Sequence, residues 1–406
     1  MRPSTPLARA FGIAVGLAAL PGLLMASAGP AAADDLGALR LPDRVKAESR
    51  VGGGAVVAPA LREAKGTVTV SVAMSEKPIA ETVPADALPN KTLPSRAQQR
   101  ARTAAVGAQQ DSVVRQARKL GAHDLGRATK AANAVAMTIP AKNLSRLAAL
   151  DGVVSVKPVA RYEMHQDPGG SGSLAQAADY LKVNAARNAG YDGTGVRVAV
   201  LDSGIDYTHA YLGGPGTQAA YAQCYEGASG TAYKVAPVGP CAGLFGPGAP
   251  KVKGGYDFVG ETWPTTTPET PDPNPIDLEG HGTHVADIAG GRSADGTHQG
   301  IAPGVDLYAV KVCSAVATSC SGVAILQGID WALDPNGDGD ISDAVDIVNL
   351  SLGSAYGQAE DDSSAALDNL VRAGVVAVVA AGSSVTRTGP AATALDSLVP
   401  SSREMV

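Results

Sequence analysis

The stretch that decides the fold is VRVAVLDSGID, Val196–Asp206. Its first six residues, VRVAVL, are apolar apart from Arg197, which is typical of a strand buried on both faces of a sheet. Similar runs alternate with segments of helical spacing along the rest of the chain. The predicted strands are 307–312, 345–350 and 375–381, and the predicted helices are 175–189, 282–290, 322–333 and 362–373. This alternation predicts an α/β fold built on a parallel, doubly wound sheet.

Asp202 follows the strand directly, at its carboxyl end. In open parallel sheets the chemistry gathers at these ends, so Asp202 is a candidate catalytic residue. Many α/β proteins also have an Asp there for a metal, a ribose or a turn. A nicotinamide-binding site is excluded, because Gly193 and Gly195 precede the strand, whereas phosphate-binding glycines follow it.

A second motif, Gly280-His281-Gly282-Thr283-His284-Val285-Ala286, is expected to open a helix. His281 lies between two glycines that would let a substrate approach, which suits a general base. We expect a structural role for His284. The motif does not fit a zinc peptidase, whose His residues are four apart with Glu beside the first.

The chain is divided by composition into segments with different expected roles. We expect a secretory signal (1–33), a loose leader (34–65), a small α+β unit (66–165), a linker (166–173), the α/β domain (174–382) with an inserted surface region (213–277), and a tail without strand or helix rhythm (383–406). In the small unit the predicted strands are 66–75, 133–139 and 153–159, and the predicted helices are 95–120 and 141–150. The region 213–277 is predicted to hold little strand or helix.

The amino terminus has the pattern of a secretory signal. Arg2 and Arg9 precede an apolar run, and small residues offer cleavage after Ala28 or Ala33. The competing interpretation is a membrane anchor, which the shortness of the run and Pro21 disfavour. We therefore expect a secreted, extracellular protein without a membrane anchor.

Export would allow the four cysteines to form disulfides. Their order suggests the local pairs Cys224–Cys241 and Cys313–Cys320, although three connectivities are possible and the sequence does not choose among them. A structural zinc site is the alternative. It is disfavoured because neither pair is a CxxC and no His lies close to either.

Charge is distributed unevenly. Residues 34–165 carry 20 Lys and Arg against 12 Asp and Glu, a net charge of +8, and residues 166–406 carry 11 against 27, a net charge of −16. The opposite signs favour docking of the first part on the second. Separate solvation of each part explains the charges equally well. We expect no nucleic-acid partner.

Three motifs together resemble the subtilase family of serine proteases: VAVLDSGID, HGTHVA and VNLSLG (Val348–Gly353). The resemblance covers about residues 174–382 and implies an α/β fold of the subtilisin type, here incomplete. It implies a secreted endopeptidase, made as a precursor, that needs no cofactor and hydrolyses polypeptides through an Asp, His and Ser triad in that chain order. By this resemblance Asp202 orients His281, and His281 is the general base.

The resemblance also implies residues that bind the substrate. Ser351, Leu352 and Gly353 match the stretch that pairs with the substrate as an extra strand and forms one wall of the first specificity pocket. Ala380, Ala381 and Gly382 match the opposite wall. The small unit, with LSRLAALDGVVSVKP at 144–158, resembles the family's propeptide. It would assist folding and act as an intramolecular inhibitor until cut near His165–Gly170.

The sequence departs from the family after Gly382. Ser383 stands where the family has an Asn that donates to the oxyanion, a loss that typically costs about 100- to 1,000-fold in turnover. The family's nucleophile lies in a Gly-Thr-Ser run, and no such run occurs in this sequence. A frame change or truncation after Gly382 is the favoured explanation. We therefore expect the 406-residue chain to be inactive as a protease. The alternative is a catalytically dead module that acts as a protease inhibitor or folding aid.

The acidic stretch from Asp334 to Asp343 spaces oxygen ligands as calcium loops do. It is not a standard EF-hand, because Val345 stands at the twelfth position. A structural calcium site and a solvated acidic turn are both open interpretations. The candidate ligands are Asp334, Asn336, Asp338, Asp340 and Asp343.

Overall fold

A computed structural model gives the fold. It describes residues 55–84, 93–164, 173–225, 241, 243–265, 267–354 and 361–380. The predicted signal, most of the leader and linker, and the tail from 383 lie outside these residues. Among the described residues, no helix has the length and apolar character needed to span a bilayer.

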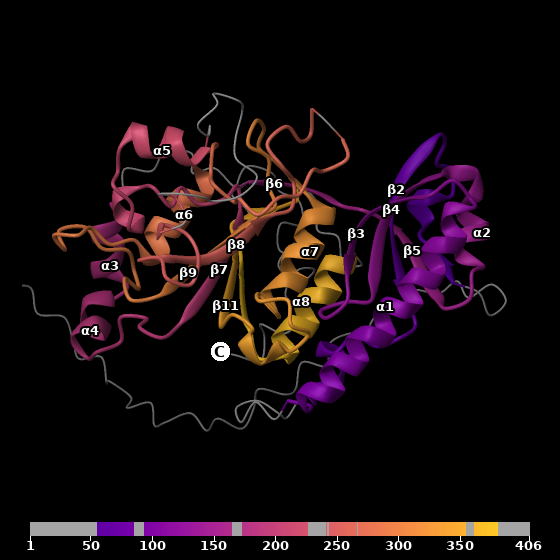
Figure 1. Cartoon of the computed structure of the whole chain (residues 1–406), viewed down its shortest axis with the longest axis horizontal. Helices are drawn as coiled ribbons and strands as arrows, with labels where there is room; N and C mark the ends of the chain where they lie inside the picture. The colour runs from indigo at the N-terminus through magenta and orange to yellow at the C-terminus, as the bar shows by residue number, and fades with distance from the viewer. Residues whose placement is uncertain are drawn as a thin grey trace, which may run out of the picture. The chain divides into compact units, whose positions relative to one another are not determined.

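Residues 55–164 form an α+β domain in which two helices accompany one sheet (Figure 1). In spatial order its strands are β1 (Val56–Val57), β5 (Val153–Pro158), β2 (Thr67–Met74), β4 (Ala134–Pro140) and β3 (His123–Ala128). Its helices are α1 (Arg96–Arg118) and α2 (Leu144–Ala148), and its 3₁₀ turns are η1 (Pro59–Leu61), η2 (Ala80–Thr82) and η4 (Ala141–Asn143). We call this part the amino-terminal domain.

Helix α1 begins at a capping box. The side chain of Ser95 accepts from the N–H of Gln98, and the Gln98 side chain accepts from the N–H of Ser95. Further along α1, Val113 and Val114 are buried in one apolar core with residues of the sheet such as Val70. The amino-terminal domain therefore has a core of its own.

Residues 173–380 form the larger domain, whose main sheet is entirely parallel. In spatial order its strands are β13 (Val376–Val379), β11 (Ile347–Leu350), β7 (Arg197–Asp202), β9 (Asp306–Lys311) and β8 (Val252–Asp257). Its helices are α3 (Leu174–Tyr180), α4 (Val183–Asn188), α5 (Gln218–Tyr225), α6 (His281–Gly290), α7 (Gly322–Ala332) and α8 (Asp362–Arg372), and its 3₁₀ turns are η5 (Ala210–Leu212) and η7 (Ile341–Asp343).

The central strand β7 packs against helices on both faces. Ala199 and Leu201 belong to the core that contains residues of α7 and α8, whereas Val198 and Val200 belong to the core that contains Ala286 of α6. Side chains of a strand alternate between faces, so two separate cores follow from one apolar run. The predicted doubly wound α/β sheet is confirmed, and Figure 1 shows α7 and α8 together beside it.

A third, three-stranded sheet joins the two domains. Its central strand β6 (Arg161–Met164) comes from the amino-terminal domain, and it lies antiparallel between β10 (Ser319–Ser321) and β12 (Leu352–Gly353) of the larger domain. Residues 161–164 were not predicted as a strand. Their pairing partners belong to distant parts of the sequence, so local pattern alone does not reveal them.

Several other expectations need correction. The leader is not loose throughout, because β1 pairs in parallel with β5 and extends the amino-terminal domain before residue 66. The single helix predicted over 175–189 is broken at Lys182, whose φ is 62°. The region 213–277 holds helix α5 and strand β8, and β8 is the edge strand of the main sheet next to β9.

Strand β8 escaped prediction because its sequence, VKGGYD, lacks an apolar run. Gly255 has a φ of 151°, and a Cβ atom there would lie 1.9 Å from the carbonyl oxygen of Ala309 in β9. Glycine is therefore required at position 255, where the backbone of β8 approaches the backbone of β9.

Two disulfides lie in the larger domain, Cys224–Cys241 and Cys313–Cys320. They are the local pairs that the order of the cysteines suggested. The alternative zinc interpretation is wrong, since all four sulfurs are used in these bonds.

Gly255→Ala should destabilise the fold. The added methyl group must displace the backbone of β9, and overpacking of this kind costs about 1–3 kcal/mol in the free energy of unfolding. Gly248→Ala is the matched control, because no atom lies within 4 Å of a Cβ at that position. Urea denaturation of the three proteins measures the difference, and equal midpoints would contradict the close approach of β8 to β9.

Candidate active site

Asp202 and His281, which are 79 residues apart in the sequence, are in contact. Asp202 ends strand β7 and is 0% exposed, and its Oδ1 lies 2.7 Å from Nδ1 of His281, the first residue of α6. Oδ1 also accepts from the N–H of Ser203 at 2.7 Å. Burial raises the pKa of Asp202 above its usual value, and the contact with His281 opposes that rise. The ring of His281 is thereby oriented by a buried carboxylate.

The start of helix α6 is held by a second carboxylate, that of Asp277. Its Oδ1 accepts from the N–H groups of Glu279 and Gly280, both at 3.0 Å. Its Oδ2 accepts from the N–H and the hydroxyl of Thr283, at 2.9 and 2.6 Å. Orphan N–H groups at a helix start are stabilised by such acceptors. Asp277 therefore fixes the turn that carries His281.

The loop after β7 is bonded to the same turn of α6. Ser203 Oγ accepts from the N–H of Gly282 at 2.8 Å, and Thr283 Oγ1 accepts from the N–H of Asp206 at 2.9 Å. A Cβ at Gly282 would lie 2.2 Å from the carbonyl oxygen of Gly204, so the glycine permits the close approach. These bonds lock the distance between Asp202 and His281.

A fully buried lysine supports this region from the neighbouring strand. Lys311 ends β9 opposite Asp202, and its Nζ lies 2.6 Å from Glu261 Oε1 and 3.2 Å from Asp257 Oδ2. Burial opposes its charge, but the two carboxylates raise the pKa of Lys311 above its usual value. Nζ also donates to the carbonyl of Ile276 at 3.3 Å, next to the Asp277 that holds α6.

These supporting residues were not predicted from the sequence, although the positions of Asp277 and Lys311 each have a recognisable pattern. Asp277 is an acidic residue shortly before a predicted helix start, where a negative charge is favourable. Lys311 is a charged residue inside the apolar run LYAVKV, which indicates a buried ion pair. His284, for which the sequence predicts a structural role, is exposed and takes no part in the contact between Asp202 and His281.

The stretch expected to pair with a substrate already pairs with a strand. Leu352 and Gly353 of β12 lie opposite Met164 and Glu163 of β6. Ser351, just before β12, accepts a 3.0 Å hydrogen bond from the Asn349 amide. Ala380 donates its N–H to the carbonyl of Leu350 at 3.0 Å, and the other predicted wall residues, Ala381 and Gly382, lie with Ser383 outside the described residues.

The two domains are joined by a buried carboxylate as well as by β6. Asp330 of α7 is 6% exposed, and its Oδ1 accepts from the N–H groups of Thr129, Lys130 and Ala131 at 2.9, 2.6 and 2.7 Å. One oxygen atom of α7 therefore binds three consecutive N–H groups of the amino-terminal domain. The acidic larger domain thus contacts the basic amino-terminal domain, which is one of the two arrangements that the charge distribution left open.

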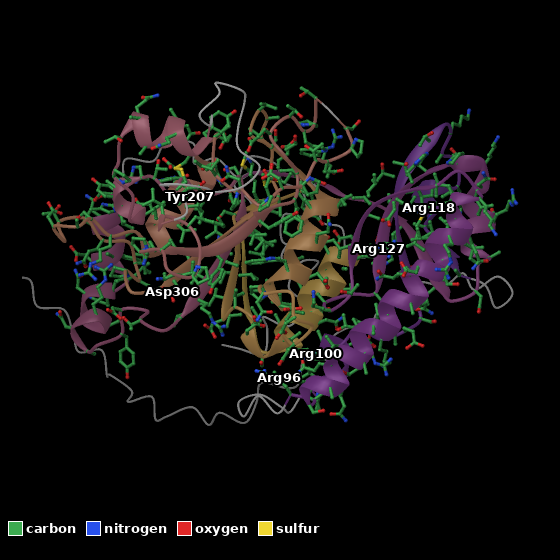
Figure 2. All side chains as sticks on the ribbon, viewed as in Figure 1. Arg96, Arg100, Arg118, Arg127, Tyr207 and Asp306 are labelled. Carbon is green, nitrogen blue, oxygen red and sulfur yellow. A yellow bond between two sulfur atoms is a disulfide. The ribbon has the colours of Figure 1, made fainter. Side chains whose placement is uncertain are left out.

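The acidic loop 334–343 also contacts the amino-terminal domain. Arg96 and Arg100 of α1, labelled in Figure 2, lie 2.6 Å from Asp340 Oδ2 and 3.5 Å from Asp338 Oδ2. Lys130 Nζ lies 3.3 Å from Asp334 Oδ2. Among the described residues, no group of three or more His, Cys, Asp or Glu side chains is placed to hold a metal ion. Calcium binding by this loop stays a prediction.

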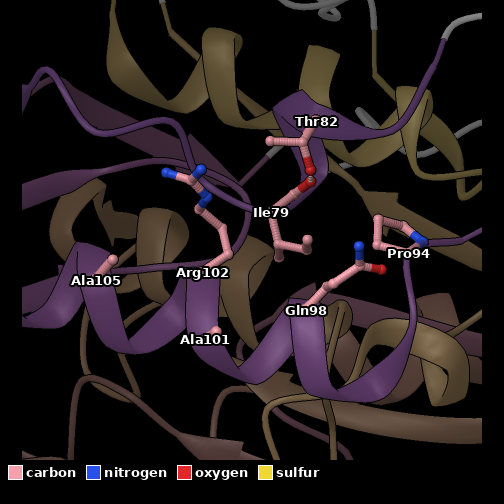
Figure 3. Close-up of a pocket in the computed structure, with 7 residues that line it drawn as sticks. All are labelled: Ile79, Thr82, Pro94, Gln98, Ala101, Arg102 and Ala105. Carbon is pink, nitrogen blue, oxygen red and sulfur yellow. Dashed lines mark hydrogen bonds between the residues drawn. The ribbon is translucent and has the colours of Figure 1, made fainter.

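A hollow of 460 Å³ lies within the amino-terminal domain, between α1 and η2 (Figure 3). It is lined by Ile79, Thr82, Pro94, Gln98, Ala101, Arg102 and Ala105. Arg102 there lies 2.8 Å from Glu76. None of the lining residues belongs to the pair of Asp202 and His281, so the hollow is separate from the candidate active site.

Comparison with known proteins identifies relatives of this chain. The Peptidase_S8 profile, described as the subtilase family, matches residues 193–398 and so extends past Gly382. The minor extracellular protease Vpr of Bacillus subtilis is 27% identical over 325 residues, which cover 78% of this chain and 33% of that protein. The alkaline elastase YaB of a Bacillus species is 34% identical over 201 residues, which cover 49% of this chain and 37% of that protein.

Among solved structures, fervidolysin from Fervidobacterium pennivorans, a keratinolytic enzyme related to subtilisin, is similar with a TM-score of 0.48 and 17% identity. The match covers 82% of this chain and 42% of that one. The chain therefore spans between a third and about two fifths of the length of these relatives.

Asp272 should give the region around Lys311 a pH-dependent stability. Asp272 is 6% exposed, and burial, with the charges of Asp257 and Glu261, raises its pKa from 3.8 to about 7. A carboxyl group with a raised pKa binds its proton more tightly in the folded state. Its contribution to stability is therefore full below about pH 4 and is lost as the pH rises to about 7, by about 1.4 kcal/mol per pKa unit.

Asp272→Asn removes this dependence, so the variant should gain stability relative to the parent between about pH 4 and pH 7. Denaturation across that range measures it. Asp295→Asn is the opposite control, because hydrogen bonds from Ser293 and Thr297 lower the pKa of Asp295 to about 2. A parallel pH course for parent and Asp272→Asn would contradict the raised pKa.

Proposed function

This chain belongs to the subtilase family, and we propose that the protein acts as a serine endopeptidase on polypeptides. The observation that carries the proposal is the 2.7 Å contact between His281 Nδ1 and the buried carboxylate of Asp202. In acyl transfer, a carboxylate in this position fixes the tautomer of the imidazole and stabilises the imidazolium as it forms. The names of the relatives, an extracellular protease and an elastase, agree with this activity.

The proposed steps use the two ring nitrogens of His281 differently. Nδ1–H donates to Asp202, so Nε2 is the atom that takes a proton from a serine hydroxyl and returns it to the leaving amine. The serine oxygen bonds to the peptide carbonyl, and the acyl-enzyme formed is then hydrolysed by water. The sequence contains no Gly-Thr-Ser run to supply this serine. We therefore propose that these 406 residues alone do not cleave peptides.

The space between β10 and β12 is proposed as the binding site of the substrate backbone. Strand β6 lies there in an antiparallel arrangement, as an added peptide strand would. The amino-terminal domain would then inhibit the site by occupying it until the chain is cut after β6. The N–H bonds to Asp330 and the contacts of Arg96 and Arg100 support such docking.

We also propose that the protein is secreted. The basic and apolar amino terminus supports export, and the two disulfides are stable in an oxidising compartment. Cleavage near His165–Gly170 and a structural calcium ion in the loop 334–343 belong to the same proposal, in which Ser383 replaces the oxyanion-donating Asn of the family.

A fluorophosphonate probe tests the proposed chemistry, because it labels only an activated serine. The 406-residue chain should remain unlabelled beside a subtilisin treated in parallel, and clear labelling would contradict its inactivity. A chimera that adds the carboxyl-terminal protease segment of Vpr should become labelled. His281→Ala should then slow labelling of the chimera by roughly 10⁴-fold or more. A cooperatively folded chimera that labels no faster than its His281→Ala variant would contradict the proposed function.

A further inference from the structure

Strand β6 presents alternate side chains to the larger domain. Arg161 and Glu163 are exposed, whereas Tyr162 and Met164 are 1% and 5% exposed. Tyr162 and Met164 belong to one apolar core with Leu352 of β12 and with residues of α7 and α8. The larger domain therefore recognises two of the four side chains of the strand.

The side chain of Tyr162 ends at a carboxylate. Its hydroxyl donates a hydrogen bond to Oδ2 of Asp361, which is 7% exposed. The other oxygen, Oδ1, accepts from the N–H of Ser364 at 2.7 Å, because Asp361 caps the start of α8. Asp361 is thus held by the helix that it caps, with one oxygen directed at the side chain that β6 supplies.

The proton of this hydrogen bond belongs to the tyrosine. Burial, followed by the charge of Asp361, raises the pKa of Tyr162 well above its usual value, so the hydroxyl stays a donor. Phenylalanine would fill the same apolar space but would leave a buried carboxylate oxygen without its donor. An unsatisfied buried charge is costly, and sites built around a hydroxyl reject the analogue that lacks it.

We propose that Asp361 is a specificity-determining residue, and that the site between β10 and β12 selects polypeptides with tyrosine, rather than phenylalanine, at the place of Tyr162. A large apolar side chain two residues further on, at the place of Met164, completes the selected motif. This inference rests on the proposed role of that site in binding the substrate backbone.

A peptide titration tests the proposal. The full chain carrying Tyr162→Gly and Met164→Gly removes the two buried side chains of β6 from the site. Fluorescent peptides of residues 159–168, VARYEMHQDP, and the counterpart VARFEMHQDP are then titrated by anisotropy. The tyrosine peptide should bind at least about tenfold more tightly than the phenylalanine peptide.

Two further substitutions test whether the affinity ratio of the tyrosine and phenylalanine peptides depends on the carboxylate of Asp361. Adding Asp361→Asn should reduce it to about threefold or less, because Oδ1 still caps α8 and the amide group facing the tyrosine carries no charge. Adding Asp362→Asn should leave it unchanged, since Asp362 bonds Ser71 and Lys157 of the amino-terminal domain. Equal binding of the two peptides would overturn the role of Asp361 but not the proposed substrate site. Binding of neither peptide would contradict both this role and the proposed substrate site.

Hydrogen exchange supplies a second measurement, for which the buried side chains of β6 do not have to be removed from the site. In the otherwise unchanged chain, Tyr162→Phe should speed amide exchange across β6 by about tenfold, whereas Arg161→Ala, at an exposed position of the same strand, should not. Unchanged exchange in Tyr162→Phe would also overturn the proposal.

Discussion

The arrangement of the site depends on one constraint, the burial of the Asp202 carboxylate at the carboxyl end of β7. An ion in that environment must be hydrogen-bonded, because its desolvation is otherwise too costly. The donors come from Ser203, next in sequence, and from His281, which begins α6. The imidazole therefore takes its orientation from Asp202 Oδ1, while the bonds of Ser203 and Thr283 hold the start of α6 against the loop after β7.

The contact between Asp202 and His281 is embedded in a further set of polar bonds. Asp277 holds the first turn of α6 through four hydrogen bonds, and the buried ammonium group of Lys311 bonds to the carbonyl of Ile276, the residue before Asp277. Asp277 and Lys311 are both buried and bonded, so the removal of either leaves partners unsatisfied. Such a network limits the movement of His281, as a general base requires if it is to meet a nucleophile in a fixed geometry.

The parts of the fold that could be predicted are those whose signal is local. Strand β7 contains the apolar run Val198–Leu201, and the candidate pair of Asp202 and His281 stands at the end of one predicted element and the start of another. Strand β8 could not be predicted, because its glycines serve a close approach to β9 that only the sheet defines. The bond between Tyr162 and Asp361 spans 199 residues, and no sequence period relates them. Buried ions such as Lys311 are specified by partners in space rather than by neighbours in the chain.

The hydrogen bond between His281 and Asp202 is tested most directly by proton NMR of the imidazole N–H groups. A proton held between Nδ1 and a buried carboxylate exchanges slowly with water and resonates far downfield. One such signal is expected, coupled to the Nδ1 nitrogen of His281, and it should be lost in Asp202→Ala and kept in His284→Ala. A spectrum without this signal, or one in which it survives Asp202→Ala, would contradict a hydrogen bond between His281 and Asp202.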